Sequence, residues 1–152
     1  MRRAIYASLF VAWGCGSDPA PQVEILEVTP TDIVTSIDAR NDVKLRLHYF
    51  DDNGDLGEGL AEIHDCRVDG LVTTLLLPPI ANEDAVVADV AIEGELSLLV
   101  NDVTDVSGTP GCSAFGQPAP APGQLSLCVV LVDLAWNRSE ADCSQPIAFT
   151  TE

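Results

Sequence analysis

Apolar and polar residues alternate with a period of two along much of the chain, the pattern of strands that bury one face. In the clearest run, Val43–Phe50, every odd position is Val, Leu or Tyr, and three of the four even positions are basic. No segment shows a capped apolar stripe of helical period, and 56–65 forms one helical turn at most. Further runs predict strands at 23–28, 33–37, 62–68, 71–77, 85–92, 95–100, 125–133 and 147–150.

Turn-forming residues separate these runs. Asn53-Gly54, Asp69-Gly70 and Pro78-Pro79 are strong turn pairs, and 116–123 (GQPAPAPG) is too rich in proline for a central strand. Seven to nine short strands in this span predict an all-β fold, a single immunoglobulin-like antiparallel β-sandwich over 23–152. A closed barrel is the alternative.

The start of the chain has the pattern of an export signal. Arg2 and Arg3 precede an apolar stretch at 4–13, which is shorter than the roughly 20 residues that span a bilayer as a helix. Small residues and Cys15 follow. The run Ala12-Trp13-Gly14-Cys15 resembles the lipobox of bacterial lipoprotein precursors, with Ala12 where that family usually has Leu.

This resemblance implies cleavage before Cys15 and attachment of lipid to that residue. The chain then divides into a signal peptide at 1–14, a lipidated cysteine with a Pro-containing tether at 15–22, and the domain. We expect an exported protein held by Cys15 in a membrane, the outer membrane where the organism has one. An ordinary cleaved signal, with Cys15 incidental, is the alternative.

Four cysteines lie within the predicted domain: Cys66, Cys112, Cys128 and Cys143. An even number in an exported domain predicts two disulfides. No pair has CxxC spacing, so a zinc cluster is not expected. Three pairings are possible. The favoured one joins Cys112 to Cys128 across one loop and leaves Cys66 with Cys143.

The chain is strongly acidic, with 24 acidic residues, seven basic ones and a net charge of −17. Loss of Arg2 and Arg3 with the signal would leave five basic residues and a charge of −19. Such a protein is repelled by nucleic acid, so no nucleic-acid partner is expected. The charge favours divalent cations or cationic partners, and it equally fits a solvated acidic surface.

Two polar loops follow the two clearest strands. Asp51, Asn53 and Asp55 alternate in the first, and Asp133 and Asn137 lie in the second. In an immunoglobulin-like topology these loops share one end of the sandwich, where their charges repel unless a cation lies between them. Calcium binds roughly six to eight oxygens of this kind. These five residues therefore form a predicted calcium site; the alternative is that they only cap their own turns.

The same loops resemble motifs of exported bacterial domains with immunoglobulin-like or cadherin-like sandwiches. Residues 51–57 (DDNGDLG) are similar to DxDGDxG, and 133–139 (DLAWNRS) are similar to D-x-A-G-N-x-S. Asn53 stands in place of an Asp, and Trp136 in place of a Gly. The resemblance implies the sandwich fold. An EF-hand is not expected, because Leu56 occupies its glycine position and a strand precedes the loop.

Other chemistry has little support in the sequence. His48 shares a strand face with basic residues and is expected to be solvated, and His64 lacks partners for a metal site. There is no GxSxG elbow and no phosphate-binding glycine loop. Trp136, at a hairpin tip, is expected to cover the sandwich end, with an exposed anchor for a partner as the alternative.

Taken together, these features predict a cell-envelope lipoprotein whose domain is a non-catalytic binding or structural module. Calcium is its candidate cofactor and the membrane its expected contact, through Cys15. The sequence does not identify a protein or glycan partner. The alternatives are an accessory subunit of an envelope or secretion assembly and a calcium-dependent hydrolase.

Overall fold

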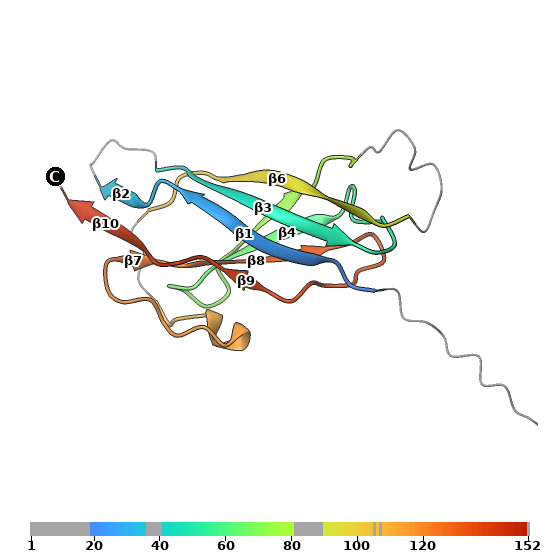
Figure 1. The fold of residues 1–152 in the computed structure, drawn as a ribbon. Coiled ribbons are helices and arrows are strands. Elements are labelled where there is room, and N and C mark those ends of the chain that lie inside the picture. Colours follow the sequence, from blue (N-terminus) through green and yellow to red (C-terminus); the bar gives the residue numbers. More distant parts are fainter. Residues whose placement is uncertain (1–18, 36–40, 81–89, 105, 107, 152) are drawn as a thin grey trace, which may run out of the picture.

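The computed structural model describes residues 19–35, 41–80, 90–104, 106 and 108–151, which form an all-β sandwich (Figure 1). No helix among these residues is long and apolar enough to cross a membrane. The predicted signal, Cys15 and most of the strand expected at 85–92 lie outside the described residues. The strands are β1 (Gln22–Thr29), β2 (Asp32–Thr35), β3 (Val43–Asp51), β4 (Leu60–Asp65), β5 (Val72–Leu76), β6 (Ile92–Val100), β7 (Gln124–Leu125), β8 (Leu127–Val132), β9 (Asp142–Cys143) and β10 (Ile147–Thr151), with one 3-10 helix, η1 (Cys112–Phe115).

Two sheets make the sandwich. One has the order β1-β3-β6 and the other β5-β4-β8-β9, with antiparallel neighbours in both. A short third sheet, β2-β10-β7, contains a parallel pair, β2 with β10. Among the described residues neither main sheet closes on itself, so the arrangement is a β-sandwich, as predicted, and not a closed barrel.

The core lies between the two main sheets, and its residues follow the alternation seen in the sequence. Every second residue of β3 is buried, as predicted for its apolar face. By contrast, β8 is buried along its whole length, which suits its continuous apolar sequence LCVVLV. The buried cluster includes Val43, Leu45, Leu47, Ala61, Ile63, Leu98, Leu127, Val129 and Leu131.

A second, smaller core covers the outer face of β8. It consists of Cys66, Cys112 and Cys128, with Phe115 and Ala141 packed against it. The helix η1 supplies Cys112 and Phe115 to this small core. It therefore covers apolar side chains on the outer face of β8 that solvent would otherwise contact.

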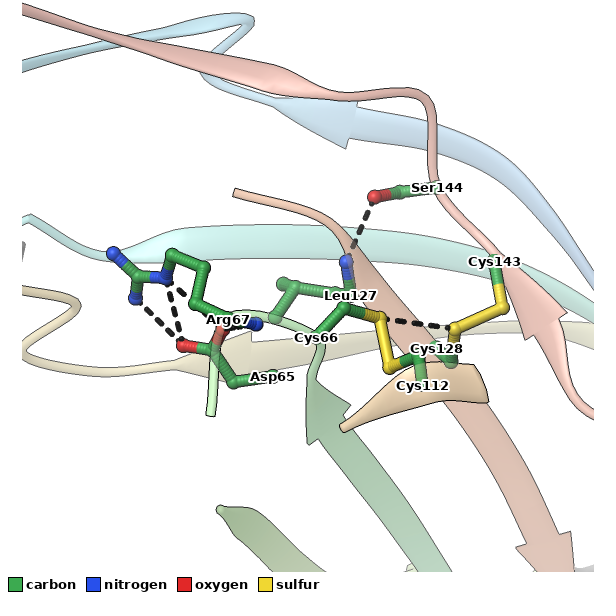
Figure 2. Close-up of a disulfide and its surroundings, with 8 residues drawn as sticks. All are labelled: Asp65, Cys66, Arg67, Cys112, Leu127, Cys128, Cys143 and Ser144. Atoms are coloured by element: carbon green, nitrogen blue, oxygen red, sulfur yellow. Dashed lines mark hydrogen bonds and ion pairs between the residues drawn. A yellow bond between two sulfur atoms is a disulfide. The ribbon is translucent and has the colours of Figure 1, made fainter. Parts of the chain in front are cut away.

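Two disulfides lie side by side in this small core (Figure 2). Cys66 is bonded to Cys112, and Cys128 to Cys143, so the predicted pairing was wrong. The reason is the register of a strand that the sequence did not reveal: β9 places Cys143 directly opposite Cys128. The Sγ atoms of Cys66 and Cys128, from different disulfides, are 3.4 Å apart.

Other expected strands differ from the observed ones in their bounds. The strand expected at 62–68 is β4, which begins earlier, at Leu60, and ends at Asp65. The strand expected at 125–133 is split at Ser126, where the chain passes from β7 in the short sheet to β8. The strand expected at 33–37 is β2, which is described as far as Thr35.

Candidate functional site

The loops after β3 and β8 meet at one end of the sandwich, as predicted. The N–H of Leu134 donates to the carbonyl oxygen of Asp55 at 3.2 Å. Gly59 permits this approach, because a Cβ at that position would lie 2.2 Å from the carbonyl oxygen of Val132. The two acidic loops are therefore held together by the backbone itself.

Asp51, the last residue of β3, lies beneath the two loops at this end of the sandwich. Its side chain is fully buried, and Oδ2 accepts a hydrogen bond from the N–H of Leu56 at 2.8 Å. Leu56 is itself buried in the core and holds the loop down. Gly54 makes the turn with a φ of 75°, and a Cβ there would lie 2.2 Å from the carbonyl oxygen of Val90.

Three oxygens of this loop are buried without a hydrogen-bond partner. They are Oδ1 of Asp51, Oδ1 of Asn53 and Oδ1 of Asp55. Among the described residues, Nε2 of His64 also makes no hydrogen bond of good geometry, but it lies 3.4 Å from a carboxylate oxygen of Glu62. A buried acceptor without a donor costs about 1–3 kcal/mol, and more when it is charged. Three in one loop are therefore expensive unless a cation or ordered water satisfies them.

Asp133 adds a second buried carboxylate from the other loop. It is 3% exposed, and both of its oxygens accept hydrogen bonds from Asn137. The backbone N–H donates at 2.8 Å and the side-chain amide at 2.9 Å. Asn137 thus orients Asp133 and directs its amide nitrogen toward that carboxylate, the turn-capping role foreseen as the alternative.

The carboxylates of the two loops affect one another. Burial raises the pKa of Asp51, and the charge of Asp133 raises it further. Hydrogen bonding to the backbone N–H groups of Leu56, Asn53 and Asp55 lowers it, and the net change is an increase. The pKa of Asp55 is also raised, first by burial and then by the charges of Asp133 and Asp51. Burial and neighbouring negative charge thus disfavour ionisation of Asp51 and Asp55.

The chemistry of these groups fits a hard cation. Carboxylate and amide oxygens are what calcium prefers, and three of them accept no hydrogen bond of good geometry. A different trio, the sulfurs of Cys66, Cys112 and Cys128, lies within 4.8 Å, but all three are in disulfides and offer no thiolate.

Trp136 does not cover the sandwich end, so that expectation was wrong. Its side chain is 75% exposed at the tip of the β8–β9 connection. Its backbone has a φ of 67°, in the left-handed region that suits the glycine of the similar motif. The turn is closed by the Trp136 N–H, which donates to the carbonyl oxygen of Asp133 at 3.1 Å.

The two histidines serve ordinary structural roles in the described fold. His48 lies 2.9 Å from Glu93 on the outer face of its sheet and is partly solvated. His64 packs edge-on against Phe115 with ring centroids 4.8 Å apart. The hollow beside His64 is lined by Asp69, Val72 and Phe115 among others, and it contains no serine and no free thiol.

Comparisons with protein-family models, curated proteins and solved structures found no match to this chain.

Proposed function

We propose that this protein is a non-catalytic module of the bacterial cell envelope, anchored by lipid on Cys15 and stabilised by calcium at one loop end. The observation that carries the calcium proposal is the set of three buried oxygens without partners. They come from Asp51, Asn53 and Asp55, in a loop held against Asp133.

This arrangement has two energetic costs, which are the oxygens without partners and the repulsion among the carboxylates, and a calcium ion would reduce both. It would give the partnerless oxygens an electrostatic partner, and it would offset the repulsion that raises the pKa values of Asp51 and Asp55. Asn137 would hold Asp133 in place from behind, in the way that outer-shell groups orient metal ligands. Backbone carbonyls or water would complete the coordination, as is usual for calcium.

Isothermal titration calorimetry of the exported domain with calcium chloride tests this proposal. Binding of one ion per chain is expected. Asp51→Asn should weaken binding about tenfold or more, because it removes one negative charge from the ligand set. The asparagine can still accept the hydrogen bond of Leu56, so the loop should keep its shape.

Asp52→Asn is the matched control. It makes the same chemical change one residue away, at an exposed position of the same loop. Its calcium affinity should stay within about twofold of the unaltered domain, since surface charges are well screened. Absence of binding in the unaltered domain, or equal losses in the two variants, would contradict the proposed site.

The anchor is tested separately in cells. Cys15→Ser should release the protein from the membrane fraction, and mass spectrometry of the unaltered protein should find an acylated N-terminal peptide beginning at Cys15. Continued membrane retention of the serine variant, or an N-terminal peptide without lipid, would count against the anchor.

A further inference from the structure

The three most exposed large apolar side chains among the described residues gather at the end of the sandwich that holds the candidate calcium site. They are Trp136 at 75%, Leu76 at 73% and Leu134 at 55% exposed. Trp136 and Leu134 belong to the β8–β9 connection that contacts Asp55. Apolar groups so exposed are typical of contact surfaces when they cluster.

Strand register places Leu76 at the same end. Leu76, the last residue of β5, pairs with Leu60, the first residue of β4. Leu60 in turn pairs with Val132, the last residue of β8 and two residues before Leu134. The exposed side chains therefore come from strand ends that are aligned across one sheet.

The N-terminal tether leaves the domain at this end as well. Gln22, the first residue of β1, pairs with Phe50, next to Asp51. Figure 1 shows the chain entering β1 at the end where β3 finishes, while the C-terminus lies at the opposite end. Pro21, just before β1, is already buried against the domain.

The reach of the tether is short. Six residues lie between Cys15 and Gln22, and the seven steps from one to the other span at most about 25 Å when fully extended. The nine residues of β3 are themselves about 30 Å long. A lipid on Cys15 would thus keep this end close to the bilayer, and the C-terminal end would point away.

We propose that Trp136, Leu134 and Leu76 rest in the headgroup region of the phospholipid bilayer that holds Cys15. This inference rests on the lipid anchor of the proposed function. Tryptophan favours that region because its ring is apolar and its N–H is polar. A tryptophan in the left-handed region is strained, and such strain persists mostly where the exposed side chain has a use. The acidic residues nearby favour a zwitterionic lipid surface over an anionic one.

Tryptophan fluorescence tests this placement directly. The chain has two tryptophans, and Trp13 would leave with the signal, so Trp136 is the sole emitter of the processed protein. Purified lipidated protein is reconstituted into phosphatidylcholine vesicles, with and without brominated acyl chains near the headgroups. The expected result is a blue-shifted Trp136 emission that the brominated lipid quenches by about half or more.

A second protein supplies the control. In a Trp136→Phe background, Leu99→Trp puts the emitter on an exposed position near the opposite end, where Leu99 pairs with Lys44. Its emission should be unchanged by bromine. Unquenched Trp136 emission in protein that carries lipid would overturn the inference and leave the anchor standing. Shielding of Trp136 from aqueous acrylamide without quenching by bromine would also overturn it, in favour of contact with a second copy of the protein. An N-terminal peptide without lipid would overturn anchor and inference together, whereas the calcium titration is independent of both.

Discussion

Replacing Cys66 and Cys112 together by alanine is expected to lower the free energy of unfolding by about 4 kcal/mol. The disulfide joins residues 46 apart in sequence, and a constraint of that length removes about this much from the entropy of the unfolded chain. Such a loss is a large part of the roughly 5–15 kcal/mol that stabilises a typical domain.

The structural consequence should be local at first. This disulfide ties η1 to the end of β4 and so holds Phe115 over the outer face of β8. Without it, the segment 108–116 should become sensitive to proteases before the domain unfolds. Urea denaturation measures the free energy, and limited proteolysis with mass spectrometry locates the first cuts.

The second disulfide gives a matched comparison. Cys128 and Cys143 are 15 residues apart, so their joint replacement by alanine should cost about 3 kcal/mol, less than the first pair. Peptide mapping of the unaltered protein should yield Cys66–Cys112 and Cys128–Cys143 peptides. A Cys112–Cys128 peptide, or a larger loss from the shorter loop, would contradict the pairing.

Calcium at about a hundredfold excess over its Kd is expected to raise the free energy of unfolding by about 2.7 kcal/mol near neutral pH. Calcium sites of extracellular modules have Kd values of about 0.1–1 mM, so about 10 mM calcium is a suitable condition for a site at the tight end of that range. The comparison is made by urea denaturation in calcium and in EDTA.

The effect of calcium should shrink as the pH falls through the raised pKa values of Asp51 and Asp55. The pKa values of Asp51 and Asp55 are raised above their ordinary 3.8, so the folded domain without calcium binds more protons than the unfolded chain over the interval above that value. Its stability therefore rises as pH falls through the folded pKa values. Protons and calcium compete for the same oxygens. The difference in free energy of unfolding between the calcium-bound and calcium-free domain therefore becomes smaller over this pH interval.

The ion pair of Glu62 with Arg138 changes stability with pH in the opposite direction, and it sets the lowest pH at which the experiment is useful. Arg138 holds the pKa of Glu62 below its ordinary 4.5, so this pair contributes stability that is lost as pH falls through the lowered pKa. Measurements between about pH 5 and pH 7 stay above that loss. A calcium effect that grows as pH falls would contradict the assignment to Asp51 and Asp55.

Much of the fold was predictable because strict alternation marks strands that bury one face. The alternating run Val43–Phe50 predicts β3 to within one residue. The alternating strand directions of a sandwich predict that the loops of Asp133 and Asp55 meet at one end, and the structure places them there. The pairing of Cys128 with Cys143 was not predictable, because β9 has only two residues and no alternation of its own.

The candidate site was only partly predictable for a similar reason. Residue type and spacing identified Asp51, Asn53 and Asp55, but burial without a donor depends on how Leu56 and Gly59 fold the loop. The exposure of Trp136 and Leu76 depends on which strand ends align, and no local pattern records that. The sequence feature that pointed to an unusual role for Trp136 is its position, where the similar motif has glycine.

A crystal structure of the domain grown in calcium, with the ion identified by its anomalous scattering, tests the central claim most directly. The expected result is one calcium ion bound by Oδ1 of Asp51, Asn53 and Asp55, with Asp133 beside it and Asn137 still bonded to Asp133. Well-ordered loops in which these three oxygens bind only water or protein donors, at saturating calcium, would contradict it.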